Sequence, residues 1–278
     1  MGNKNKLPDV FNVEQLIKLF DAIDRPKVAI ACSLAFFCGL RISEVCNLRI
    51  EDIDLERKIL KVVDGKNSRR KFSGYGKDRY VPIPPQLIHP LNVWIDIING
   101  GKWLLPSDKS PDTHLRKKSL HEQFREVLNH SGLLIPAYTI EFEAKVNGKK
   151  VKRRRTRHKY YFHTLRHAYA TYLRDKGMDI YNISALLGHS QVTTTQIYAR
   201  ISDKQLTNAV NDAFNVPLHH QVIPQDTVKR LTSAKPNQSP MEYLQMQVLQ
   251  GEITKDEYRE KLELLREAKN EVIYPEKL

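Results

Sequence analysis

Apolar residues recur at helical spacing near the start of the chain. In VEQLIKLFDAI, after Asn12, they fall three or four positions apart, which is typical of an amphipathic helix, and Pro26 breaks the pattern. The next segment, VAIACSLAFFCGL, is almost entirely apolar and predicts a buried central helix that closes at Gly39. Helical periodicity resumes in ISEVCNLR, directly after Arg41. The N-terminal part is therefore predicted to be helical, with its second helix at the centre.

Two pairs of strands are predicted among the helices. Residues 58–63 and 79–83 have the composition of strands, and a polar, glycine-rich loop separates them. A second hairpin is predicted over YTIEFEAKV and KKVKRRRTRHKYYF, because the dipeptide Asn147-Gly148 between them favours the tight turn that matches strand twist. This second hairpin ends directly before the segment HTLRH.

The remaining periodicity is again helical. A helix over 163–176 places Leu165, Tyr169 and Leu173 on a common side, and Gly188 ends a shorter helix in DIYNISALLG. Further helices are predicted over 86–98, 119–131 and 203–214, with one more after Ser190. These elements predict a mainly α fold with a small antiparallel β-sheet, which is an α+β architecture.

The C-terminal part differs from the rest. Residues 216–238 contain three prolines and no clear periodicity, which indicates a linker. Beyond it, two helical patterns, the second opened by a capping box from Thr254 to Glu257, predict a helical hairpin. Such a hairpin buries too little surface to fold alone, so we expect it to pack on its own domain or on a neighbouring protomer. The predicted division is a catalytic-sized domain (1–215), the linker, and a C-terminal helical hairpin (239–278).

Charge and composition narrow the class of protein. The chain carries 45 Lys and Arg against 32 Asp and Glu, a net charge of +13, which favours nucleic acid as a partner. No apolar run approaches the roughly 18 residues of a membrane span, and no secretory signal is visible, so we expect a cytoplasmic, DNA-associated protein without a membrane contact. The cysteines lack a CxxC pair and are expected to be reduced and buried; they are Cys32, Cys38 and Cys46.

The segment HTLRH combines residues suited to phosphate chemistry. His163 and Arg166 are three positions apart on a predicted helix, so both can reach one small anion. His163 and His167 have the spacing of a zinc pair, but the glutamate of an HExxH motif is missing and Arg166 would repel a dication. A zinc pair and a purely structural histidine are the alternatives to phosphate chemistry.

Three further residues fit the same chemistry: Arg41, His189 and Tyr198. Two guanidiniums can hold both non-bridging oxygens of a phosphodiester and spread the charge that develops as phosphorus becomes five-coordinate. Imidazoles add proton transfer near neutral pH. A tyrosine, with a pKa of about 10, needs such neighbours to attack phosphorus. Each residue alone is a weak signal. Together and in this order, the set of Arg41, His163, Arg166, His189 and Tyr198 is much more specific.

The ordered set resembles the tyrosine recombinase, or phage-integrase, family. The gap from Arg166 to Gly188 is 22 residues, as in the family. The step from His189 to Tyr198 is nine residues, and it matches as well. The resemblance covers roughly residues 8–214. The segments that resemble the four family signatures are GLRISEVCNLRIEDID (39–54), HTLRH (163–167), LLGHS (186–190) and TTTQIYARIS (193–202).

The resemblance implies a role for each matched residue, within a tyrosine recombinase catalytic-domain fold. Arg41 and Arg166 would bind the scissile phosphate. His163 would assist proton transfer from the nucleophile, and His189 would donate a hydrogen bond to a non-bridging oxygen. Tyr198 would attack phosphorus to leave a 3'-phosphotyrosine and a free 5'-hydroxyl.

Two assignments have alternatives. Glu44 matches the family's acid after the first arginine and would support Arg41 or the first histidine of HTLRH, or it is an ordinary helix carboxylate. The family's general acid is a lysine in a strand-turn-strand hairpin, whose GKGxKxR turn is shorter than the loop in this chain. Lys66 matches the first lysine of that turn and is preferred; Lys77 matches the second by its distance from RYVPI, and Lys71 is the third alternative.

The family chemistry implies no cofactor and no metal. The arginines take the electrostatic role that a pair of Mg²⁺ ions would fill, and resealing the phosphodiester needs no ATP. The sequence accordingly has no GxxxxGK[ST] loop.

The basic stretch 145–159 predicts a DNA contact. It carries nine Lys or Arg and no acid, which is more than a solvated face needs, and we expect salt-sensitive contacts to the DNA backbone near the cleavage site. A charged loop that is disordered when DNA is absent is the simpler interpretation, and it is compatible with this contact. The residues predicted to contact DNA are Lys149, Lys150, Lys152, Arg153, Arg154, Arg155, Arg157 and Lys77.

The sequence as a whole predicts a site-specific DNA recombinase, an integrase of a mobile element. It would act on double-stranded DNA as a homo-oligomer, in a tetrameric synapse, and would be a monomer when free. The alternatives are DNA relaxation, as in type IB topoisomerases, and a non-catalytic protein that uses LLGHSQVTTTQIYA as a helix-turn-helix. Family members usually carry a helical core-binding domain before the first signature, so a start of the pattern almost at Met1 favours a fragment or a minimal enzyme.

Overall fold

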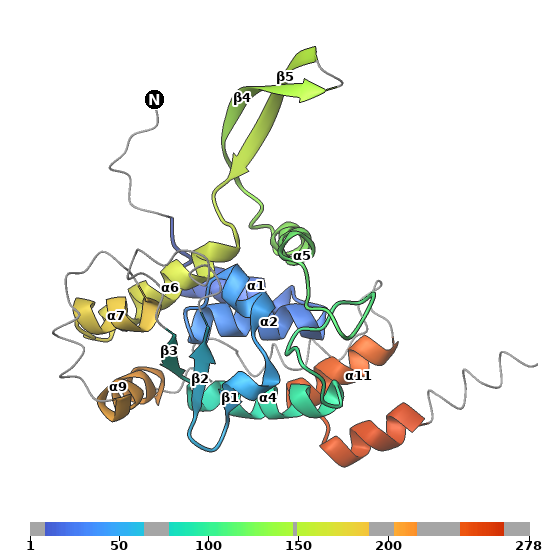
Figure 1. Cartoon of the computed structure of the whole chain (residues 1–278), viewed down its shortest axis with the longest axis vertical. Coiled ribbons are helices and arrows are strands. Elements are labelled where there is room, and N and C mark those ends of the chain that lie inside the picture. The colour runs from blue at the N-terminus through green and yellow to red at the C-terminus, as the bar shows by residue number, and fades with distance from the viewer. Residues whose placement is uncertain (1–8, 64–77, 147–148, 189–202, 216–239, 264–278) are drawn as a thin grey trace, which may run out of the picture.

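The structure is a computed structural model that describes residues 9–63, 78–146, 149–188, 203–215 and 240–263. These residues form a helical body from which one long β-hairpin projects (Figure 1). The helices are α1 (Val13–Asp21), α2 (Pro26–Phe37), α3 (Ile42–Asn47), the 3-10 helix η1 (Ile50–Asp52), α4 (Pro85–Ile97), α5 (Lys117–His130), α6 (Phe162–Asp175), α7 (Ile180–Leu187), α9 (Asp203–Asn215) and α11 (Pro240–Leu249). The strands are β1 (Ile53–Asp54), β2 (Ile59–Val62), β3 (Arg79–Pro82), β4 (Pro136–Val146) and β5 (Lys149–His158). The predicted mainly α fold with small antiparallel sheets is confirmed.

Helix α2 lies at the centre of the body, as its apolar sequence predicts. Most of its side chains are buried, and it contacts α3, α4, α5, α6 and α11. The three cysteines are free and buried, as expected. Burial raises the pKa of each thiol, that of Cys46 to about 12, so these cysteines are protonated packing residues.

The first two helices are separated differently from the prediction. The pattern predicts a break at Pro26, but α1 already ends at Asp21, and Pro26 is the first residue of α2. Proline is well suited to that position, because the amides of a first helical turn have no helical partner to lose. The start of α1 is closed by a capping box, in which the side chains of Asn12 and Gln15 each accept a hydrogen bond from the other's backbone N–H.

The first sheet has three antiparallel strands in the order β1-β2-β3. Leu60 pairs with Val81, and both side chains are buried in the main core. The predicted pair of strands is therefore confirmed. Strand β1 was not predicted, because two residues are too few to establish a period. The loop between β2 and β3 lies outside the described residues.

The second sheet is the projecting hairpin of β4 and β5. Its strands pair in register from Tyr138 with Arg157 to Val146 with Lys149, across the two residues 147–148, which the structure does not describe. The predicted hairpin is confirmed. At about 3.4 Å per residue, strands of ten and eleven residues reach roughly 35 Å from the body.

Helices α6, α7 and α9 pack around a smaller apolar cluster that includes Tyr169, Leu187 and Phe214. Gly188 ends α7 in the left-handed conformation (φ 64°), as the sequence predicts. Gly39, after α2, also has a φ of 64°. A Cβ atom on Gly39 would lie 2.5 Å from Cδ1 of Tyr169, so this turn and α6 approach too closely for any side chain.

The C-terminal residues 240–263 pack on the body. Leu244, Val248 and Tyr258 join the main core, and α11 contacts α2 and α4. The predicted capping box is present: Glu257 accepts from the backbone N–H of Thr254 at 2.7 Å and donates its own N–H to the threonine hydroxyl at 3.2 Å. The division at 216–238 stays a prediction, because these residues lie outside the described part. None of the described helices is long and apolar enough to span a membrane.

Two of the glycines with a positive φ, Gly39 and Gly132, allow backbone strain to be separated from close packing. Gly132 has a φ of 70° and nothing within 4 Å of the place that a Cβ atom would take, so Gly132→Ala should lower the free energy of unfolding by about 1–2 kcal/mol from the backbone alone. Gly39→Ala adds the overlap with Tyr169 and should cost about 2–5 kcal/mol in all. Urea unfolding measures both; equal losses would contradict the packing argument.

Candidate active site

The N-terminus of α3 brings Arg41 and Glu44 together. The turn at Gly39 leaves Arg41 as the residue before the helix, where its backbone N–H donates to Oε2 of Glu44 at 2.8 Å. Its guanidinium Nη1 donates to Oε1 of the same carboxylate at 2.7 Å. Glu44 therefore closes the first turn of α3 and fixes the direction of the Arg41 side chain.

Arg166 reaches the same place from α6. Its side chain is only 3% exposed. Nη1 donates to the carbonyl oxygen of Gly39 and Nη2 to that of Leu187, both at 2.6 Å, and Nη1 lies 3.7 Å from Oε2 of Glu44. Burial, together with the charge of Arg41, lowers the pKa of Arg166 to about 9, so the group remains a cation at neutral pH. The carbonyl oxygens replace the water that burial removes.

Arg79, the first residue of β3, is a third arginine of this cluster, and the sequence analysis missed it. Its Nη1 and Nη2 donate to the two oxygens of Glu44 at 3.0 and 2.9 Å, in a bidentate pair. Its Nε donates to the carbonyl oxygen of Leu186 at 3.0 Å. Its position could have indicated it, because Arg79 begins the predicted strand segment RYVPI. The sequence analysis used that segment only to choose among the lysines.

The cluster has an excess of positive charge. Three guanidiniums surround one carboxylate. The carbonyl oxygens at the C-terminus of α7 compensate part of the remaining positive charge. The carbonyl oxygen of Gly188 is one of them, and it accepts a hydrogen bond from Nη2 of Arg41 at 3.3 Å. Burial would raise the pKa of Glu44, but the hydrogen bonds and charge of Arg79 and the hydrogen bonds of Arg41 outweigh it and lower the pKa to about 2. Arg41 is the most exposed of the three arginines, at 37% of its side chain against 14% for Arg79. An anion can therefore approach the cluster at Arg41.

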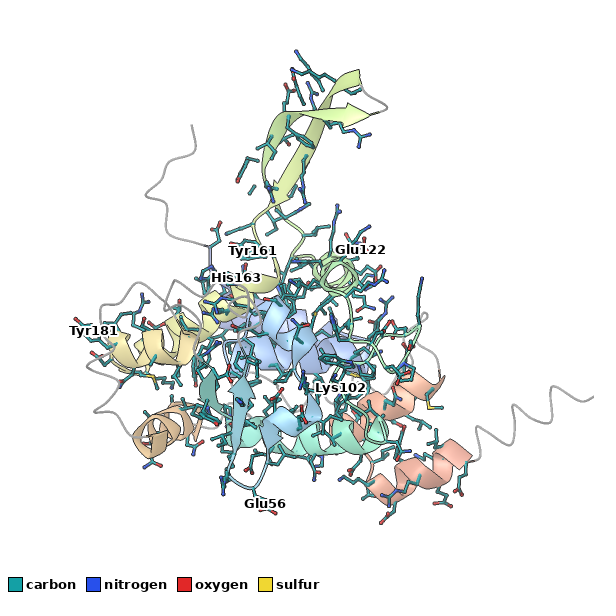
Figure 2. The ribbon with its side chains drawn as sticks, in the orientation of Figure 1. Glu56, Lys102, Glu122, Tyr161, His163 and Tyr181 are labelled. Carbon is teal, nitrogen blue, oxygen red and sulfur yellow. The ribbon has the colours of Figure 1, made fainter. Side chains whose placement is uncertain are left out.

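His163 lies in the first turn of α6, at the base of the hairpin (Figure 2). Its ring stacks on that of Tyr161, with centroids 6.5 Å apart, and meets the edge of His167 at 4.7 Å. Burial and the charge of Arg166 lower the pKa of His167, which favours its neutral form at neutral pH. Among the residues that the structure describes, no group of three His, Cys, Asp or Glu could hold a metal ion.

Several predicted site residues lie outside the described part of the chain: His189, Tyr198, Lys66, Lys77 and Lys71. The described residues next to them do reach the cluster. Gly188, which precedes the predicted histidine, accepts the hydrogen bond from Arg41, and Arg79 follows the second lysine by two positions. The structure thus brings together Arg41, Glu44 and Arg166, and adds Arg79.

Apart from Lys77, all residues predicted to contact DNA lie on β5 of the projecting hairpin, away from the arginine cluster. Two of these cations have carboxylate partners on β4: Arg154 with Glu141 at 2.7 Å and Lys150 with Glu143 at 3.2 Å. The excess of positive charge in this segment is therefore smaller than the sequence of β5 alone indicates.

Comparison with known proteins shows the family of the chain. The profile of the phage integrase family matches residues 9–205, most of the chain, so this chain belongs to that family. It is 32% identical over 212 residues to a tyrosine recombinase of Thermosipho africanus, covering 74% of this chain and 62% of that protein. It is 31% identical over 207 residues to tyrosine recombinase XerA of Pyrococcus horikoshii, with the same coverage. The chain thus spans somewhat less than two thirds of these relatives.

The fold is also found among solved structures. The integrase from mycobacterium phage Brujita superposes with a TM-score of 0.54 over 83% of this chain and 66% of that one, at 16% sequence identity. The crystal structure of XerA recombinase superposes with a TM-score of 0.51 over 76% of this chain and 65% of that one, at 24% identity. At such identities the likeness establishes the fold.

The ionised Glu44 predicts a pH dependence of stability. Its pKa in the folded protein, about 2, lies below the ordinary 4.5, so its contribution is complete above pH 4.5 and is lost as the pH falls towards 2. Glu44→Gln should therefore lower the free energy of unfolding at pH 7 by on the order of 3 kcal/mol, and the difference from wild type should shrink below pH 4.5.

Urea unfolding between pH 3 and 7 measures this difference. The matched control is Glu122→Gln on α5, where the carboxylate is 64% exposed and lies 3.8 Å from Lys118 (Figure 2). It should change the free energy of unfolding by less than about 1 kcal/mol at any pH. A constant difference between wild type and Glu44→Gln across this range would show that Glu44 is not held ionised by its arginines.

Proposed function

We propose that this chain cuts and rejoins double-stranded DNA at specific sites through a covalent intermediate between Tyr198 and a DNA 3'-phosphate. The observation that carries the proposal is the cluster of Arg41, Arg79 and Arg166 around the one carboxylate of Glu44, in a chain of the phage integrase family. A phosphodiester gains negative charge as it becomes five-coordinate. Fixed cations that are already in position stabilise that charge without reorganisation.

The cleavage step makes one bond and breaks one. Oη of Tyr198 attacks the scissile phosphorus as the bond to the 5'-oxygen breaks. The proton of the tyrosine hydroxyl leaves with the help of His163, and the leaving 5'-oxygen takes a proton from Lys66, the preferred of the three candidate lysines. Attack by a free 5'-hydroxyl on the phosphotyrosine reverses the step. Since the phosphodiester's free energy is retained in the intermediate, neither ATP nor a metal ion is a reactant.

The phosphate itself is held by residues from several segments. Arg41 and Arg166 bind its non-bridging oxygens, and His189 donates a hydrogen bond to one of them. Glu44 and Arg79 do not need to touch DNA. They determine where the guanidinium of Arg41 lies, because the carboxylate that Arg41 contacts is itself held at both oxygens by Arg79. We therefore assign Glu44 and Arg79 as positioning residues.

Recombination also implies an assembly. Two duplexes are each cut on both strands, which requires four nucleophiles, so we propose a homotetramer on DNA that is monomeric when free. Its place in the cell is with the chromosomal or element DNA in the cytoplasm. The described part of the C-terminal hairpin, residues 240–263, packs on the helical body of the same chain.

A nicked suicide duplex tests the chemistry, because loss of a short 5'-strand traps the covalent intermediate. DNA flanking the gene supplies the candidate sites. The wild-type chain should form a detergent-stable adduct, Tyr198→Phe should form none, and Arg41→Ala should slow adduct formation at least about 100-fold. The matched control is Tyr181→Phe, at the N-terminal end of α7, which should form the adduct at the wild-type rate.

Two outcomes would contradict the proposal. One is the absence of an adduct on every candidate site, which would favour a protein that only binds DNA. The other is an adduct with Tyr198→Phe. A plasmid carrying two sites then distinguishes the reactions, since recombination yields recombinant circles and relaxation yields only relaxed topoisomers.

A further inference from the structure

The projecting hairpin has two chemically different faces. Directly paired residues of antiparallel strands share a face, and successive residues alternate between faces. From the register, one face carries Thr139, Glu141, Glu143 and Lys145 of β4 and, opposite them, Thr156, Arg154, Lys152 and Lys150 of β5. The other face carries Tyr138, Ile140 and Phe142 of β4 and, opposite them, Arg157, Arg155 and Arg153 of β5. We refer to these as the ion-paired face and the arginine-aromatic face.

The ion-paired face neutralises half of its own positive charge. Nε of Arg154 lies 2.7 Å from Oε1 of Glu141, and Nζ of Lys150 lies 3.2 Å from Oε2 of Glu143. Thr139 and Thr156 face each other with their hydroxyl oxygens 3.4 Å apart. Two carboxylates on this face offset two of its four cations, so half of its positive charge is neutralised within the hairpin.

The arginine-aromatic face keeps its charge and exposes apolar surface. Arg153, Arg155 and Arg157 are exposed, and no ion pair of these three is found within the described part of the chain. Between them, Tyr138 is 62% exposed and Phe142 is 41% exposed. The described part of the chain does not cover these aromatic side chains, and their mixture with arginine is typical of a recognition surface.

We propose that the arginine-aromatic face binds duplex DNA next to the cleavage site, while the ion-paired face remains in solvent. The proposal rests on the proposed function, and it assigns the DNA contact to one face of the hairpin. The three arginines without a carboxylate partner can donate hydrogen bonds to phosphates and base edges. The apolar side chains between them can contact the sugars and the thymine methyl groups of a groove. A two-stranded ribbon fits the major groove, which is about 12 Å wide.

The base of the hairpin connects this face to the site. The chain passes from His158 through Tyr160 directly into α6, which carries His163 and Arg166. Tyr160 is buried, stacks on Phe11 with centroids 4.4 Å apart, and donates its hydroxyl to Oε1 of Gln15 at 3.1 Å. The hairpin is thus joined to the body by packed aromatic contacts. DNA bound along it therefore lies in a defined direction from the arginine cluster.

The experiment compares two triple variants that remove the same charge. Arg153→Ala, Arg155→Ala and Arg157→Ala together alter the arginine-aromatic face. Lys150→Ala, Lys152→Ala and Arg154→Ala together alter the ion-paired face. Each triple lowers the net charge from +13 to +10. Binding is measured by fluorescence anisotropy with a labelled duplex that extends past the hairpin, over a range of KCl concentrations.

The arginine-aromatic triple variant should weaken DNA binding by roughly 10- to 100-fold. It should also reduce the slope of log affinity against log salt concentration by about 1 to 3, because each lost phosphate contact lowers that slope by about 0.9. The ion-paired triple should change the affinity less than about threefold. Equal losses in both triples would overturn the proposal, because they would show a response to net charge alone. A larger loss in the ion-paired triple would overturn it as well.

The aromatic part has its own test. Tyr138→Ala with Phe142→Ala should weaken binding and leave the salt slope unchanged, because no charge is removed. Unchanged affinity would show that the apolar side chains face something other than DNA. If this variant instead abolished self-association in the absence of DNA, the face would be an interface between copies of the chain, and the proposal would be wrong.

Failure of the inference about the hairpin can be distinguished from failure of the proposed function. The suicide-duplex adduct is measured on the same variants. If wild type forms the adduct and the two triples bind DNA equally well, the inference about the hairpin fails and the proposed chemistry stands. If wild type forms no adduct but the triples differ in binding, the chemistry fails and the DNA-binding face stands. Circular dichroism and a thermal transition matching wild type show that each variant is folded.

Discussion

The carboxylate of Glu44 is the interaction on which the candidate site depends. It accepts hydrogen bonds from Arg41 and Arg79, and Arg166 lies 3.7 Å away, so residues from a loop, a strand and a helix meet at one group. Without a carboxylate, three guanidiniums this close would repel one another. With it, they remain together and still carry more positive than negative charge. A site built in this way is held in shape by the same charges that attract an anion.

The surrounding fold explains why this arrangement is stable. Arg166 is buried, but its guanidinium meets the carbonyl oxygens of Gly39 and Leu187, where two chain segments end in left-handed glycine turns. The C-terminus of α7 points its free carbonyls at the cluster, and these oxygens take the place of solvent. The close approach of Gly39 to Tyr169 fixes the distance between the turn and α6. Packing and electrostatics therefore support the same geometry.

The hairpin shows why the position of a charge matters more than its count. The stretch 145–159 has nine cations and no acid, which indicates a uniformly basic segment. Strand pairing places Glu141 and Glu143 opposite two of these cations, and alternation puts the remaining arginines beside Tyr138 and Phe142. One segment thus becomes a ribbon with one face that is half neutralised and another whose three arginines have no carboxylate opposite them. The division between its faces depends on register alone.

Local pattern in the sequence determined most of the elements, the central position of α2 and the ordered set of signature residues, because periodicity and spacing are properties of neighbouring residues. It also placed Arg41, Glu44 and Arg166 in one site through the family resemblance. The tertiary structure alone decided that Arg79 completes the cluster, since its partner Glu44 lies 35 positions earlier in the chain. Strand β1, the docking of residues 240–263 on α2 and α4, and the ion pairs across the hairpin likewise depend on contacts between distant segments. Such contacts form only when the chain folds, so no local pattern encodes them.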